Sequence, residues 1–245
     1  MNSSDVHTLP SETIEKLLRA IPFYKAVKKE NESQYQALLK YSKVFQCSSN
    51  EQILARGQMG SWCYFLVKGQ LVVSLPDHLG RPLHVNHISP GEVFGDFAVL
   101  LKTSRTADVY VDGNCLEAIL FGTDLSLFGQ LLNFNIASLK TKLIYYRHTV
   151  QSLRWKLELY RSKYGDNPLA DKHHSIKLYT GTKDSIDELR ALHQQSVDFS
   201  KLLVEWNQTF GGSSVAMGQM PGPNIPLGFH VPGRQQTHEA NTPRS

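Results

Sequence analysis

The sequence predicts a mainly β fold with α-helices added: short N-terminal helices, then a closed all-β unit, then one long helix and a further C-terminal helix. Between residues 42 and 121, short apolar and β-branched runs alternate with Gly, Pro, Asn and Asp, which is typical of strands joined by turns. After Phe121, apolar residues recur in steps of three and four, as in a helix. The 245-residue chain is 41% hydrophobic and 20% charged, which excludes disorder throughout and provides for one good core.

Residues 1–40 are expected to form N-terminal helices that pack on the outside of the β unit. Ser11–Ile21 carries apolar residues at helical spacing, namely Ile14, Leu17, Leu18 and Ile21. Pro22 is expected to end this helix. Ser33–Leu39 indicates another short helix.

The β unit is expected over residues 41–123. Seven short runs have the composition of strands: Val44–Cys47, Gln52–Ala55, Tyr64–Val67, Gln70–Leu75, Leu83–Ile88, Ala107–Val111 and Leu116–Phe121. Their spacing along the chain is that of a sandwich or barrel.

Residues 124–164 are expected to form one long coiled-coil helix. Its apolar residues alternate in steps of three and four over more than three heptads: Ile136, Leu139, Leu143, Tyr146, Val150, Leu153, Leu157 and Tyr160. No Gly or Pro interrupts residues 130–164. An apolar seam this narrow must pack against another surface to be buried. This predicts a homodimer in which the helix faces a second copy. The alternative is a helix folded back on its own domain.

Residues 165–210 are expected to form a linker and a second amphipathic helix. Gly165, Asn167 and Pro168 break the long helix. Apolar residues then recur between Lys183 and Phe210, which predicts a helix that packs on a partner's long helix. Residues 211–245 contain six Gly and five Pro and are expected to be a disordered tail.

Several classes of function find no support in the sequence. The longest uninterrupted apolar run is Trp62–Val67, too short to insert into a membrane as a helix. No secretory signal is visible, and Cys47, Cys63 and Cys115 form neither a disulfide framework nor a zinc ligand set, so a cytoplasmic setting is expected. The histidines match no metal motif and no catalytic motif is found, so we expect no metal and no enzyme activity.

The most informative segment is residues 90–107. A strand is expected to end at Phe94, Gly95 allows a tight turn, and Asp96 opens a helical turn whose free amide groups point outward. Such amides attract anions, and Arg105 on the returning chain could bind a phosphate through two parallel hydrogen bonds. The Asp96 carboxylate could accept a hydrogen bond from a sugar hydroxyl. Together these groups suggest a nucleotide.

This segment resembles the phosphate-binding cassette of the cyclic nucleotide-binding domain, the family found in regulatory subunits of cAMP-dependent protein kinase, in nucleotide-gated channels and in bacterial catabolite activators. The family pattern is matched in place by Phe94, Gly95, Ala98, Arg105 and Ala107. Upstream, the glycine-punctuated residues 57–71 resemble the family's second to fourth strands. The resemblance covers residues 21–124.

The resemblance implies a β-roll, that is, a jelly-roll barrel, that binds a cyclic nucleotide and relays binding through a dimer helix to a partner. The ligand-binding residues it implies are Phe94, Gly95, Asp96, Phe97, Ala98, Arg105, Thr106 and Ala107. cAMP is expected first and cGMP second. Thr106 stands where cGMP-responsive members of the family carry a threonine, but threonine is also an ordinary strand residue, and bacterial cAMP receptors have Ser or Thr at the same position. In this interpretation the ligand closes onto the cassette, and the segment Asp124–Leu132 moves as a lid.

Two departures from the family pattern leave alternatives open. The acidic residue is Asp96 rather than Glu, and Ser104 stands where the family has Pro. The alternative is therefore a degenerate, ligand-free dimeric scaffold that uses its coiled coil and tail. A transcription regulator of the catabolite-activator type is a lesser alternative, because residues 165–245 show no helix-turn-helix pattern and nucleic acid is an unlikely partner.

The long helix also carries a basic stretch between residues 140 and 163. Its charges are Lys140, Lys142, Arg147, Arg154, Lys156, Arg161 and Lys163, against only Glu158. This predicts a basic outer face. Such a face is either solvated or meets an acidic partner protein, a nucleic acid or an anionic membrane surface.

Overall fold

The computed structural model describes residues 1–19, 21–163 and 167–210. Two antiparallel sheets form its centre, one with the strand order β1-β2-β9-β4-β7 and the other with the order β3-β8-β5-β6. The strands are β1 (Asn2–Asp5), β2 (Ser42–Ser48), β3 (Gln52–Leu54), β4 (Trp62–Lys68), β5 (Leu71–Pro76), β6 (Pro82–Ile88), β7 (Val93–Phe94), β8 (Asp108–Val111) and β9 (Glu117–Asp124). The predicted strand region is confirmed, and the mainly β fold with helices is as expected.

Strand β4 separates two hydrophobic clusters because successive side chains of a strand point to opposite faces. Tyr64 and Leu66 lie in the cluster between the sheets. Phe65 and Val67 lie in the larger cluster, which the helices cover. Since both faces are buried, β4 is a continuous apolar run rather than an alternating one.

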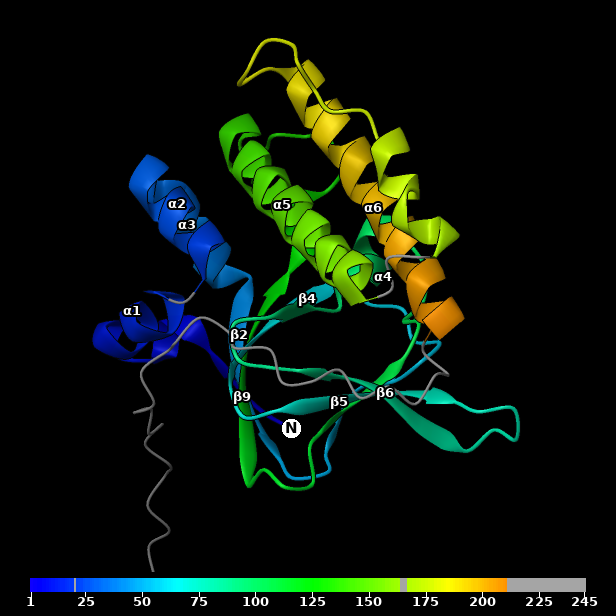
Figure 1. Ribbon diagram of the computed structural model, residues 1–245. Coiled ribbons are helices and arrows are strands. Elements are labelled where there is room, and N and C mark those ends of the chain that lie inside the picture. The colour runs from blue at the N-terminus through cyan, green and yellow to red at the C-terminus, as the bar shows by residue number, and fades with distance from the viewer. Residues whose placement is uncertain (20, 164–166, 211–245) are drawn as a thin grey trace, which may run out of the picture.

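Three N-terminal helices pack on one side of the sheets (Figure 1). They are α1 (Ser11–Arg19), α2 (Pro22–Glu30) and α3 (Glu32–Lys40). The predicted helices correspond to α1 and α3, whereas α2 was missed. The first helix, expected to run to Ile21, ends at Arg19, and Pro22 stands in the first turn of α2, where its missing N–H costs nothing.

A buried hydroxyl cluster fixes α2 to the sheet. The Tyr24 hydroxyl lies 2.6 Å from Ser42 Oγ on β2 and 2.7 Å from Thr123 Oγ1 on β9. Burial raises the pKa of Tyr24 well above its ordinary value. Strand β1, which pairs with β2, was also missed, because four exposed polar or charged residues carry no strand pattern.

Helices α5 (Leu139–Lys163) and α6 (Ile186–Phe210) lie side by side (Figure 1). The predicted seam of α5 is buried within the single chain, with Leu143, Leu153 and Leu157 almost fully covered. Tyr160 of α5 stacks on the fully buried Trp206 of α6. The expectation that this seam faces a second copy is therefore wrong, since α6 of the same chain covers it. The homodimer itself stays a prediction.

The long helix begins later than predicted. Residues 125–128 form a short 3-10 turn, η2 (Leu125–Phe128), and α5 starts at Leu139. Ile136, expected in the seam, lies before the helix and is exposed. Between α5 and α6 are two more short turns, η3 (Pro168–Ala170) and η4 (Lys172–Ser175). The predicted tail 211–245 lies outside the described residues.

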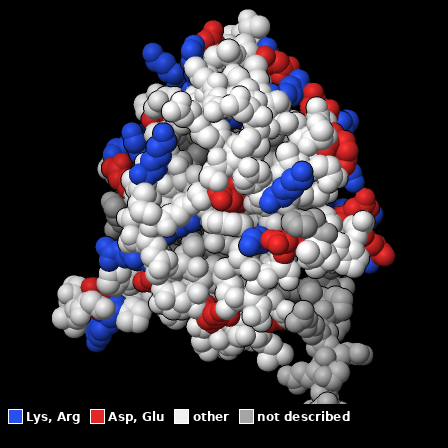
Figure 2. Space-filling view, turned by 180° about the vertical axis from the view of Figure 1, so that it is seen from behind, with Lys and Arg blue, Asp and Glu red and all other residues white. Residues whose placement is uncertain are grey.

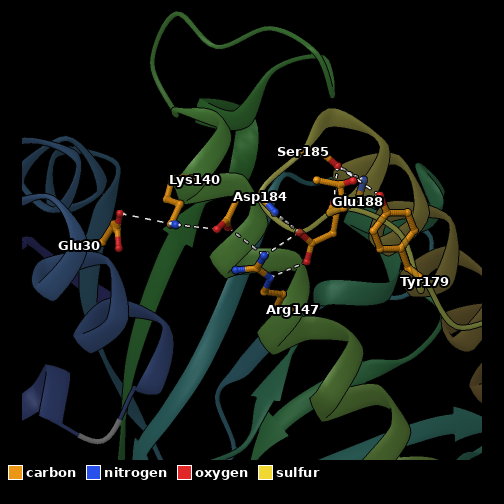
Figure 3. Close-up of polar contacts among 8 residues, drawn as sticks. Glu30, Lys140, Arg147, Tyr179, Asp184, Ser185 and Glu188 are labelled. Atoms are coloured by element: carbon orange, nitrogen blue, oxygen red, sulfur yellow. Dashed lines mark hydrogen bonds and ion pairs between the residues drawn. The ribbon is translucent and has the colours of Figure 1, made fainter.

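An ion-pair network joins α5 to the start of α6 (Figure 3). Arg147 donates from Nε to Glu188 Oε1 at 2.8 Å and from Nη2 to Glu188 Oε2 at 2.7 Å. Arg147 also reaches Asp184, and Lys140 lies 3.2 Å from Asp184 and 3.9 Å from Glu30 of α2. The hydrogen bond from Arg147 is the main cause that lowers the pKa of Glu188. These contacts tie the helical hairpin to the N-terminal helices.

No helix among the described residues is both long enough and apolar enough to span a membrane.

Candidate anion site at the turn between β7 and α4

The turn between β7 and the short helix α4 (Asp96–Leu101) has the predicted geometry. β7 pairs with β4, with Phe94 opposite Tyr64. Gly95 has φ of 77°, a left-handed conformation that glycine adopts without strain, and α4 begins at the next residue. Thr103 N–H donates to Ala98 O at 3.0 Å, which closes the turn after α4. The prediction of a strand end, a tight turn and a single helical turn is confirmed.

Arg105 is buried at this turn, with 6% of its surface exposed. Its Nη1 donates to the carbonyl oxygen of Gly95, and its Nη2 donates to the carbonyl oxygen of Trp62 at 2.7 Å. Its backbone is held by the glycine-punctuated loop, with Arg105 N–H donating to Gln58 O at 2.8 Å and Gly57 N–H donating to Arg105 O at 2.9 Å. The arginine is therefore fixed at both its backbone and its head group.

Two glycines provide the space that the guanidinium occupies. A Cβ atom on Gly95 would lie 2.9 Å from Arg105 Nη1, and one on Gly60 would lie 3.0 Å from Arg105 Nη2. Any side chain at either position would press on the head group. Gly60 belongs to the glycine pattern found in the sequence, but its contact with Arg105 was not predicted.

The Arg105 guanidinium has no anionic partner among the described residues: no carboxylate there forms an ion pair with it, and the two acceptors of its head group are neutral carbonyl oxygens. Burial lowers the pKa of Arg105 from its ordinary value, while Tyr64, Cys63 and Asp96 act in the opposite direction. Arginine nevertheless stays protonated in proteins. Because a buried charge is costly unless it is paired, this position favours an anion.

Asp96 does not pair with Arg105. It is 6% exposed, and its Oδ2 lies 4.0 Å from Nζ of Lys156 on α5. The same Lys156 ammonium donates to Val93 O at 3.1 Å and lies 5.5 Å from the ring centroid of Phe97. Lys156 was expected on an outer basic face, and this expectation is wrong. Its long side chain reaches the cassette, and the order of residues along α5 does not reveal that contact.

Aromatic rings lie beside the guanidinium, in the cluster between the sheets. Trp62 and Tyr64 stack at 6.3 Å between ring centroids, and Tyr64 and Phe94 stack at 5.3 Å. Phe45 meets both Trp62 and Tyr64 edge-on. Burial raises the pKa of Tyr64, and the charge of Arg105 acts against that rise. These rings form an apolar side of the Arg105 surroundings.

The predicted site residues are thus brought together only in part. Gly95 and Arg105 are in contact, and Phe94 is buried beside them. Asp96 is turned toward α5, and Thr106 is exposed. Phe97 and Ala107 are half-buried, and Ala98 is buried. Trp62, whose carbonyl oxygen holds Arg105, was not predicted as a site residue, because a backbone acceptor leaves no mark in the side-chain pattern.

The expected basic outer face of α5 is largely neutralised. Lys140 and Arg147 form ion pairs with acidic residues, Arg161 pairs with Glu158, and Lys142 is fully buried. In the view of Figure 2, basic and acidic side chains are interspersed over the surface rather than gathered by sign. Within the ranges that the structure describes, no group of three or more His, Cys, Asp or Glu side chains is placed to hold a metal ion.

A family model described as Cyclic nucleotide-binding domain matches residues 44–126. A regulatory subunit of a cAMP-independent protein kinase A from Trypanosoma brucei is similar in structure, with 22% identity and a TM-score of 0.45 over 62% of this chain and 50% of that chain. The regulatory domain of Toxoplasma gondii PKA with cAMP is 18% identical, with a TM-score of 0.43 over 59% of this chain and 53% of that chain.

A cyclic nucleotide-binding domain from Methylobacillus flagellatus is 15% identical, with a TM-score of 0.48 over 61% of this chain and 81% of that chain. The chain spans about half the length of the first structures that it matches, with 41%, 53% and 50% of each covered. A comparison with curated proteins finds no match. The two antiparallel sheets with helices are the fold class that the sequence predicts, and residues 44–126 are the segment that the cyclic nucleotide-binding domain model matches.

Proposed function

We propose that the chain is a regulatory protein that binds a cyclic nucleotide at the turn between β7 and α4 and relays binding through α5 and α6 to a partner. One observation carries the proposal: the Arg105 guanidinium is buried and has only neutral acceptors among the described residues. A cyclic phosphate would supply the missing negative charge through two parallel N–H···O bonds. The family match of residues 44–126 supports a cyclic nucleotide as the source of that phosphate.

Binding requires an exchange of partners at two residues. Arg105 gives up the carbonyl oxygens of Gly95 and Trp62 in favour of the phosphate. Asp96 turns from Lys156 toward the 2′-hydroxyl of the sugar. An aspartate reaches less far than a glutamate by one methylene, so a bridging water completes this contact. We expect a dissociation constant of about 1 μM or tighter.

Within the proposal, cAMP is the first ligand and cGMP the second. The only cGMP-type feature is the Thr106 hydroxyl, and Thr106 is exposed. Threonine is also an ordinary residue next to a strand, so its hydroxyl alone does not favour guanine. Binding of cGMP more tightly than cAMP would reverse this order.

The output in the proposal is conformational, with no catalytic step in this chain. The α5–α6 hairpin is the element that a partner reads, since Lys156 of α5 contacts the cassette directly. A homodimer remains part of the prediction, but the seam of α5 is already covered, so a dimer would form through other surfaces.

Calorimetric titration of the full chain with cAMP, cGMP and a cyclic dinucleotide tests the proposal. We expect heat with cAMP, and loss of that heat in Arg105→Ala. Arg105→Lys keeps the charge but loses the planar fork, and we expect at least tenfold weaker binding. Arg154→Ala, which removes an exposed arginine of α5, is the matched control and should bind like the original chain.

A ligand-free scaffold is the second candidate, and one observation favours it. Arg105 already has two backbone acceptors, and the stacked rings of Trp62, Tyr64 and Phe94 pack beside it. This candidate expects no heat with any of the three nucleotides. A transcription regulator is not proposed, because the described residues 167–210 contain two short 3-10 turns and a single α-helix rather than a helix-turn-helix.

A further inference from the structure

Lys142, near the start of α5, is completely buried. Four backbone carbonyl oxygens surround its ammonium group, at 2.6 Å for Phe128, 2.7 Å for Gln130, 3.0 Å for Leu131 and 2.6 Å for Asn133. All four belong to the turn that leads from η2 toward α5. The ammonium also lies 5.3 Å from the ring centroid of Phe134.

This arrangement is a cation site filled by the chain's own lysine. An ammonium has three N–H donors, so it is saturated by these oxygens. Among the described residues it forms no ion pair with a carboxylate, and carbonyl dipoles alone offset its charge. Burial lowers the pKa of Lys142 from its ordinary value. Moving the turn away from α5 would leave a buried charge without partners, which is costly.

The other end of the same segment is attached to the anion site. Leu125 N–H, at the start of η2, donates to Ser61 O at 2.9 Å. Ser61 precedes Trp62, whose carbonyl oxygen accepts from Arg105. The segment therefore has two anchors: the β4 start, which holds the Arg105 guanidinium, and Lys142, which belongs to α5.

We propose that Lys142 is a positioning residue that couples the Arg105 site to α5, so that residues 125–133 move with the helix rather than as a separate lid. The coupling rests on the proposed function. When a phosphate draws Arg105 away from Trp62 O, the start of β4 becomes free to shift, and η2 shifts with it. The four carbonyl oxygens that surround the Lys142 ammonium then move, and Lys142 and α5 move with them. The sequence predicted that residues 124–132 move as a lid, and in this proposal they move together with α5.

Hydrogen exchange of the full chain with and without cAMP tests the coupling. Lys142→Met keeps most of the side-chain volume but removes the ammonium. We expect it to bind cAMP within about threefold of the original chain while the cAMP-induced change in exchange along α5 is lost. Arg154→Met, an exposed cation on the same helix, should keep both. An unchanged α5 response in Lys142→Met would overturn the coupling. Loss of the response with binding retained would support it, because removal of a merely structural lysine would not separate binding from response.

A second measurement needs no nucleotide. Lys142→Ala leaves a space that a free ammonium ion fits, so ammonium chloride should restore slow exchange in residues 128–133, whereas tetramethylammonium chloride should not. Equal effects of the two salts on exchange would overturn the claim that the Lys142 ammonium anchors the turn. Absence of heat with cAMP, cGMP and the cyclic dinucleotide in the original chain would refute the proposed function and the coupling with it, while the ammonium experiment would still decide separately whether Lys142 anchors the turn.

Discussion

Substitution of Gly95 by alanine separates two costs that the structure assigns to this position. Gly95 has φ of 77°, and a Cβ atom there would lie 2.9 Å from Arg105 Nη1 and 3.3 Å from Trp62 O. Gly80 also has φ of 77°, but a Cβ atom there would meet nothing within 4 Å. Gly80→Ala therefore carries the backbone cost alone, whereas Gly95→Ala also displaces the guanidinium.

The magnitudes follow from these contacts. A non-glycine residue in the left-handed region costs about 1–2 kcal/mol, and both variants share that cost. A hydrogen bond to a charged group contributes about 1.5–3 kcal/mol, and the new methyl group displaces at least one bond of Arg105. We therefore expect Gly95→Ala to lower the free energy of unfolding by about 2 kcal/mol more than Gly80→Ala does.

Urea denaturation followed by circular dichroism measures this difference. Gly60→Ala is a further control, because its Cβ atom would lie 3.0 Å from Arg105 Nη2 while its backbone lies outside the left-handed region. It should show the cost of displacing the guanidinium without the backbone cost. Equal losses for Gly95→Ala and Gly80→Ala would refute the packing of Arg105 against Gly95.

Three more predictions concern the frame around the site. The pKa of Glu188 is lowered mainly by its hydrogen bond from Arg147, so this pair stabilises the fold above the unfolded-state pKa and loses that effect as pH falls through the lower folded-state pKa. Between about pH 6 and pH 3, the free energy of unfolding measured in urea should decrease less in Arg147→Met than in the original chain. An equal decrease would contradict the pairing of Arg147 with Glu188. Tyr24→Phe removes the hydroxyl bonded to two buried partners and should cost about 1–3 kcal/mol of unfolding free energy; an unchanged midpoint in urea would count against that cluster. Cys63 and Cys115 are both half-buried, but desolvation raises the pKa of the Cys63 thiol far above its ordinary value, so mass spectrometry after iodoacetamide treatment should find Cys115 modified before Cys63; earlier modification of Cys63 would contradict the raised pKa.

The sequence was sufficient to predict the strands of the β unit, though not β1, and the local geometry of the cassette. Period-two patterns and turn residues mark strands directly, and Gly95 followed by an acidic residue marks the tight turn. The N-terminal helix α2 was missed because Pro22 was interpreted only as a stop, although proline is equally suited to a first helical turn.

Contacts between distant segments could not be predicted in the same way. The heptad spacing of α5 defines an apolar seam, but it does not say which surface covers the seam, and α6 of the same chain does so. Charges are usually exposed, so Lys142 and Lys156 were assigned to an outer face. The structure instead places one ammonium in a ring of carbonyl oxygens and the other on the cassette.

The sequence predicted which residues belong to the site, but not which partners their side chains have in the structure. The spacing of the motif correctly predicted that Gly95 and Arg105 lie together. It could not show that Arg105 already donates to backbone carbonyls, or that Asp96 lies near Lys156. Backbone acceptors are present at every position, so the choice among them depends on how the strands meet.

The phosphorus resonance of cAMP, recorded by NMR during titration with the full chain, tests the claim about Arg105 most directly. The phosphate should move from water to the buried guanidinium, so the account predicts a saturable shift of the signal with the original chain and none with Arg105→Ala. The same shift with both proteins would show that the phosphate binds elsewhere. No shift with the original chain would contradict an anion site at this turn.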